Sequence, residues 1–105
     1  MAGERPDGGL VTEQQPGRTT GWDKVVTQLQ EVRRAAGEPS YAEIAQRVVR
    51  LRVARGETPE AARVARSTVY DSFRTGRSRI NVPLLRDIAE ALGVTPEEVD
   101  AWIAG

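Results

Sequence analysis

Helix-start signals recur along this sequence, each followed by apolar residues at helical spacing and then by a glycine or the chain end. The clearest are the S-x-x-E pattern beginning at Ser40 and the T-P-E-E pattern beginning at Thr95. In each, the first side chain can accept a hydrogen bond from a free N–H of the first helical turn. Thr58 and Asn81 open two further segments with a proline in the first turn. Because no strand-like alternation competes with these signals, we expect an all-α fold.

The first two helices are expected over about residues 20–36 and 40–55. Thr20 begins the first, with Asp23 completing an approximate capping box, and Gly37 ends it. Ser40 caps the second, which runs to about Arg55. The expected inward residues of these helices are Trp22, Val25, Val26, Leu29, Val32, Tyr41, Ile44, Ala45, Val48 and Leu51.

The second half of the chain predicts three helices, or four if one segment is broken. Residues 61–74 form either one helix or a short helix broken near Ser67, which is a plausible cap, and Gly76 closes the segment. A further helix follows Asn81 and ends at Gly93, and the last begins at Thr95. Their expected inward residues are Leu84, Leu85, Ile88, Ala89, Leu92, Val99, Trp102 and Ile103. The chain as a whole is therefore expected to form a compact domain of five helices, or of six if this segment is broken.

Residues 1–19 are rich in glycine, proline and charge and show no apolar periodicity, so we expect a disordered tail before a single domain over residues 20–105. A chain of 105 residues has room for one modest core. Hydrophobic residues make up 39% of the chain but only 5% is aromatic, so the core should consist mainly of valine, leucine, isoleucine and alanine.

The chain has no cysteine and no histidine, which excludes disulfides, thiolate chemistry, imidazole bases and nearly every zinc site. Glu97 and Glu98 are better explained as acids of a first helical turn than as a catalytic pair. We therefore expect no enzymatic activity, cofactor, metal or small-molecule substrate. The sequence has no apolar run of membrane-spanning length and no secretion signal, so a cytoplasmic location without membrane association is expected.

The net charge of zero conceals a basic middle. Residues 47–79 carry nine arginines against three acids, a net charge of +6, whereas residues 1–46 sum to −2 and residues 80–105 to −4. A phosphate-binding surface needs local positive charge, which an overall balance can hide. The alternative interpretation is that these arginines only decorate solvated helix faces.

A helix over residues 62–75 would separate its side chains onto two faces, because each residue advances by about 100°. The inward face would hold Ala62, Ala65, Val69 and Phe73, with Ser72 at its margin. The outward face would hold Ser67, Tyr70, Asp71 and Arg74. Arginine can bind guanine through two hydrogen bonds, aspartate can accept one from cytosine N4, and an aromatic edge suits the thymine methyl group. An ordinary solvated helix face is the alternative.

The order of three segments resembles the lambda-repressor/Cro-like helix-turn-helix family. Residues 40–48 carry the S-x-x-E start, residues 66–69 the R-S-T-aliphatic string, and residues 89–94 the A-x-A-L-G-V ending. The resemblance covers about residues 22–103. Fifteen residues, 49–63, separate the first two segments, where the family usually has a turn of about four. A stretched form in some large regulators from high-G+C bacteria is similar to this one and carries a comparable T-V-x-D-x-F-R-x-G-R-x-R string.

This resemblance implies a sequence-specific double-stranded DNA-binding domain of a transcriptional regulator, with a recognition helix over about residues 66–75 in the major groove. It implies base contacts from Ser67, Thr68, Tyr70, Asp71 and Arg74. It implies phosphate contacts from Ser40, Tyr41, Arg66, Arg77 and Arg79.

The second hypothesis is a protein–protein interaction module with the same helical fold and no DNA contact. The acidic end of the chain would suit such docking. Trp102 is expected in the core. If it and Val99 are exposed instead, they would mark a homodimer seam, with paired DNA half-sites about one helical turn apart. Steep salt dependence would favour DNA binding over apolar docking.

Overall fold

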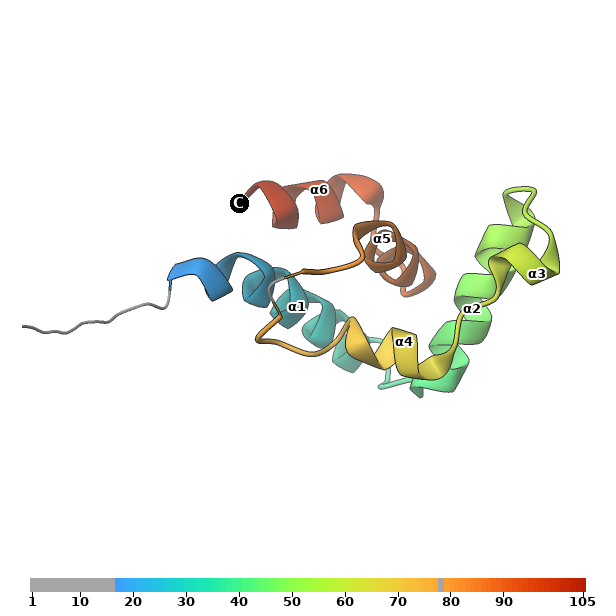
Figure 1. Ribbon diagram of the computed structural model, residues 1–105, viewed down its shortest axis with the longest axis horizontal. Coiled ribbons are helices and arrows are strands. Elements are labelled where there is room, and N and C mark those ends of the chain that lie inside the picture. The colour runs from blue at the N-terminus through green and yellow to red at the C-terminus, as the bar shows by residue number, and fades with distance from the viewer. Residues whose placement is uncertain (1–16, 78) are drawn as a thin grey trace, which may run out of the picture.

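Six helices form in the part of the chain that the computed structural model describes, residues 17–77 and 79–105 (Figure 1). They are α1 (Gly17–Ala35), α2 (Tyr41–Ala54), α3 (Pro59–Ala62), α4 (Arg66–Asp71), α5 (Val82–Ala91) and α6 (Pro96–Ala104). No strand occurs among these residues, so the all-α prediction is confirmed. None of the described helices is long and apolar enough to cross a membrane.

Local capping explains where four of the helices begin. In each, the cap side chain accepts a hydrogen bond of 3.0–3.2 Å from the backbone N–H three residues later: the pairs are Ser40 and Glu43, Thr58 and Ala61, Asn81 and Leu84, and Thr95 and Glu98. The start predicted for each of these helices is therefore confirmed.

The first helix begins earlier than predicted. Helix α1 starts at Gly17, so Thr20 lies within the helix and residues 17–19 are helical rather than part of the expected tail. The remainder of that tail, residues 1–16, lies outside the described residues. The carboxylate of Asp23 does not act in a first turn, and its Oδ1 accepts a 2.8 Å hydrogen bond from the N–H of Gly76.

The segment expected over residues 61–74 is broken into two helices. Residues 63–65 separate α3 from α4, and both Arg63 and Ala65 have extended backbone angles. Ser67 is therefore the second residue of α4, and its predicted role as a cap is wrong. The prediction that Ala65 faces inward is also wrong: this residue is exposed because the helical spacing does not continue through the break. Helix α4 ends at Asp71, and the chain continues as a turn.

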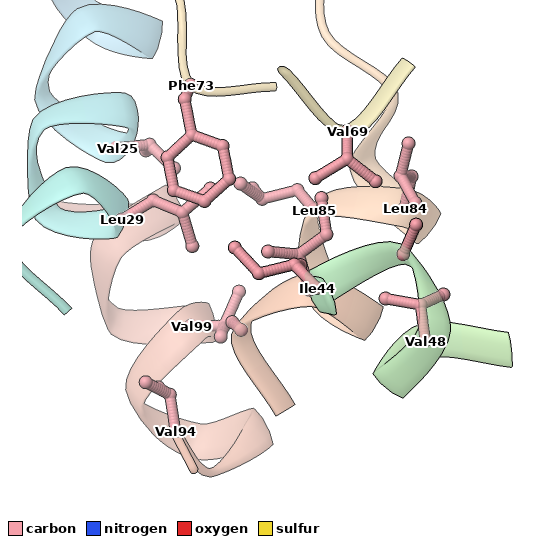
Figure 2. Close-up of a cluster of buried hydrophobic side chains, with 13 residues drawn as sticks. Val25, Leu29, Ile44, Val48, Val69, Phe73, Leu84, Leu85, Val94 and Val99 are labelled. Carbon is pink, nitrogen blue, oxygen red and sulfur yellow. The ribbon is translucent and has the colours of Figure 1, made fainter. Parts of the chain in front are cut away.

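The core lies between α1, α2, α4, α5 and α6, as Figure 2 shows for most of its members. Val69 and Phe73 are buried, as their inward positions predicted. Val99 is buried too, and Trp102 and Ile103 pack against the core, so the α6 residues considered for a dimer seam face the inside of the chain. The buried hydrophobic residues of this cluster are Val25, Leu29, Ile44, Ala45, Val48, Val69, Phe73, Leu84, Leu85, Ile88, Ala89, Val94 and Val99.

Helix α2 is the central element, because it packs against α3, α4 and α5, while α1 packs against α6. The fifteen-residue stretch 49–63 forms the last part of α2, a turn and α3. Asp87 in α5, nearly buried, anchors this stretch through ion pairs of 2.8 Å with both Arg52 and Arg55. The stretch between α2 and α4 is thus held against α5 by ion pairs with the buried carboxylate of Asp87.

Candidate nucleic-acid interface

Helix α4 presents a polar row to solvent. Val69 is fully buried beneath it, and Ser72 and Phe73 are buried in the turn that follows. Of the five residues predicted to contact bases, four are exposed and Asp71 is half-buried: the exposed ones are Ser67, Thr68, Tyr70 and Arg74. Because α4 has only six residues, Arg74 projects from the turn after the helix.

The start of α2 lies beside α4. Five residues predicted as DNA contacts line one hollow of about 360 Å³ together with Ala42: they are Ser40, Tyr41, Arg66, Ser67 and Tyr70. Ser40 is exposed there, although its Oγ already accepts the capping hydrogen bond from Glu43. Two segments separated by about twenty-five residues of sequence thus meet at one surface, which combines hydroxyl, aromatic and guanidinium groups.

An aromatic cluster fixes the relative position of α2 and α4. The ring of Tyr41 meets that of Tyr70 edge to face, with 5.2 Å between the ring centroids, and lies 5.4 Å from that of Phe73. The guanidinium of Arg33 in α1 covers Tyr41, 4.5 Å from its ring centroid, and its Nε donates to the carbonyl oxygen of Pro39. Such contacts favour one ring geometry, so the exposed part of Tyr70 has a defined direction.

Asp71 lies between two of the predicted DNA-contacting arginines. Its Oδ1 is 3.2 Å from Nη1 of Arg74 and 3.7 Å from Nη1 of Arg77. Arg77 also lines a second hollow, of about 230 Å³, with Thr68 and Asn81. Arg79 is exposed, and residue 78, which precedes it in the sequence, lies outside the described residues.

The arginines of the basic middle of the sequence do not share one surface in the fold. Arg52 and Arg55 turn toward α5, where they pair with Asp87, and Arg55 also lies 3.1 Å from Glu90. The hydrogen bond to Asp87 raises the pKa of Arg55 above its ordinary value. Much of the local positive charge near the end of α2 is therefore neutralised by the acidic C-terminal part. Arg66 lies in α4, Arg74 and Arg77 lie near its end, and Arg79 follows two residues later in the sequence.

Two α1 residues that the sequence did not link to this surface, Gln30 and Asp23, hold the segment after α4 in place. Gln30 Nε2 donates a 2.7 Å hydrogen bond to the carbonyl oxygen of Phe73, and Asp23 accepts one from Gly76. Gly76 has a φ of +81°, a left-handed conformation that glycine adopts readily. These bonds span 43 and 53 residues, so no local spacing could have revealed them.

Comparison with protein-family models, with curated proteins and with solved structures finds no match to this chain. Among residues 17–77 and 79–105, no group of three or more acidic, histidine or cysteine side chains is placed to hold a metal ion. The geometry of the surface around α4 is therefore the basis for a functional assignment.

Proposed function

We propose that this chain binds double-stranded DNA in a sequence-specific manner, with α4 in the major groove, and acts in transcriptional regulation. The arrangement we infer is that of the lambda-repressor/Cro-like helix-turn-helix family, with α2 and α4 as its two motif helices and with the fifteen-residue stretch between them. Ser67, Thr68, Tyr70 and Arg74 would face the bases.

The observation that carries this proposal is the convergence of the start of α2 and the exposed row of α4 at one hollow. The free N–H groups at the start of α2 favour an anion, and Ser40 is exposed there. Arg66 lines the same hollow, and Arg77 and Arg79 follow α4. A base-reading helix flanked by phosphate contacts on both sides is the arrangement that major-groove recognition requires.

The test is selection of bound duplexes from a random pool, followed by titration of the selected duplex by fluorescence anisotropy at several salt concentrations. Three cations at phosphates predict a slope of about −2.7 for the logarithm of the binding constant against that of the salt concentration. Affinity should then fall roughly fortyfold between about 50 and 200 mM salt. The proposal is wrong if no sequence is enriched.

One observation favours a second candidate, a helical protein-docking module. Val53 in α2 is 40% exposed, and Ala45, Val49 and Val64 line a hollow of about 310 Å³ together with the polar residues Gln46 and Arg50. An apolar surface of this kind suits the face of a partner helix. Binding to such a partner would change little with salt, which separates this candidate from DNA binding in the same type of titration.

A further inference from the structure

The carboxylate of Asp71 is shared by two arginines. The same oxygen, Oδ1, lies 3.2 Å from Nη1 of Arg74 and 3.7 Å from Nη1 of Arg77. All three side chains remain 38–52% exposed. Exposed ion pairs contribute little to folding stability, because water screens them and ordering two long side chains costs entropy. The arrangement is therefore better explained by what it does to the binding surface than by what it does to stability.

The ion pair leaves one edge of the Arg74 guanidinium free. Nη1 is directed at Asp71, so the N–H groups on Nε and Nη2 remain available as a pair of parallel donors. That pair matches O6 and N7 of guanine in the major groove. An arginine already held in one orientation loses less side-chain freedom when it binds, so more of the hydrogen-bond energy contributes to discrimination.

A direct contact between Asp71 and a base is less well supported by the same geometry. Its Oδ1 already accepts a hydrogen bond from Arg74 and forms a longer ion pair with Arg77, and the side chain is partly covered. A negative charge at this surface also repels phosphates, which lowers affinity for DNA of any sequence. Asp71 therefore lowers affinity for DNA of any sequence while it holds Arg74 in one orientation, and this combination favours selectivity over affinity.

We propose that Asp71 is a positioning residue that holds Arg74 to read a guanine, so that the preferred duplex carries a G·C pair at the position Arg74 contacts. This inference rests on the proposed function. It replaces the expectation that Asp71 contacts a base, and it makes the base preference a property of the Asp71–Arg74 pair.

A double-mutant cycle on the full chain tests this inference. The duplex selected by the parent protein and a duplex of random sequence are titrated with the parent, Asp71→Ala, Arg74→Ala and the double variant. Arg74→Ala should weaken binding to the selected duplex about tenfold and remove the guanine preference. Asp71→Ala should weaken it about fivefold and flatten the same base position, and the double variant should bind no more weakly than Arg74→Ala. Binding of Asp71→Ala to the random duplex should be unchanged or tighter.

Two further variants separate positioning from charge alone. Asp71→Asn keeps an acceptor oxygen for Arg74 and should retain part of the preference. Asp100→Ala is the matched control, because Asp100 forms an exposed ion pair with Arg86, between α5 and α6. It removes the same charge and should leave the base preference intact.

The outcomes distinguish the inference from the function on which it rests. If the parent enriches no duplex, the proposed function and this inference fail together. If the parent enriches a site but the losses of Asp71→Ala and Arg74→Ala multiply in the double variant, the positioning role alone is overturned. It is also overturned if Asp71→Ala flattens a different base position from Arg74→Ala, or if Asp100→Ala has the same effect on preference.

Discussion

The side chain of Gln30 in α1 donates a 2.7 Å hydrogen bond to the backbone carbonyl oxygen of Phe73, in the turn that ends α4. The bond joins residues 43 positions apart and is partly buried. It ties the turn after the proposed recognition helix to α1, the longest of the described helices, and Asp23 does the same for Gly76 two turns earlier in α1. The direction of α4 is therefore set by α1 as well as by α2.

Gln30→Ala is expected to lower the free energy of unfolding by about 1 kcal/mol, because it leaves a partly buried carbonyl without its partner. Urea unfolding followed by circular dichroism measures this. Gln28→Ala is the matched control, since Gln28 is exposed on the same helix, and it should change stability by less than about 0.5 kcal/mol. Equal effects of the two substitutions would contradict a role for the Gln30 bond.

Asp87→Ala is expected to lower the free energy of unfolding by about 2–3 kcal/mol, because it leaves Arg52 and Arg55 without their shared carboxylate. Breaking a fully buried ion pair typically costs about 3–5 kcal/mol. The loss expected here is smaller because Arg55 is partly exposed.

Glu90→Ala is the comparison for this variant. Glu90 is exposed and pairs with Arg55 at 3.1 Å, so its removal should cost less than about 1 kcal/mol. Chemical denaturation of both variants gives the difference. A loss for Glu90→Ala as large as that for Asp87→Ala would show that burial of the carboxylate does not matter.

The features predictable from the sequence are those set by neighbours along the chain. Ser40, Thr58, Asn81 and Thr95 each cap a helix because the cap and its backbone partner lie three residues apart. The inward positions of Val69 and Phe73 followed from helical spacing, and both are buried. Nothing local, however, marks residues 63–65 as extended, so the sequence is compatible with one continuous helix and predicts the wrong face for Ala65.

The features that could not be predicted depend on residues far apart in sequence. The charge sum over residues 47–79 suggested one basic surface, but Arg52 lies 35 residues from Asp87 and is neutralised by it. The hydrogen bond between Gln30 and Phe73 has no sequence signature either. The sequence thus predicts which α4 side chains form the candidate site, whereas the direction in which α4 presents them depends on contacts with α1 and α2.

Gly76→Ala is expected to lower the free energy of unfolding by about 1 kcal/mol or more. The residue has a φ of +81°, which strains any residue with a Cβ, even though open space surrounds the added atom. The strain would also disturb the N–H donated to Asp23. Thermal unfolding measures the effect, with Thr75→Ala, an exposed neighbour, as the control. A neutral Gly76→Ala would show that the turn after α4 adapts freely.

Arg66→Ala tests the phosphate contacts without altering the Asp71–Arg74 pair. Arg66 is exposed at the start of α4 and lines the hollow shared with Ser40. Its removal should weaken binding to the selected and the random duplex by similar factors and reduce the magnitude of the salt slope by about 0.9, because one fewer counterion is released. Arg86→Ala is the control: Arg86 in α5 pairs with Asp100 in α6 and lines a hollow with Asp87 and Glu90 rather than the hollow beside α4, so its substitution removes an equal charge elsewhere. It should leave the slope almost unchanged. If both variants reduce the slope equally, the protein binds DNA through diffuse charge, and the assignment of phosphate contacts to the start of α4 is wrong.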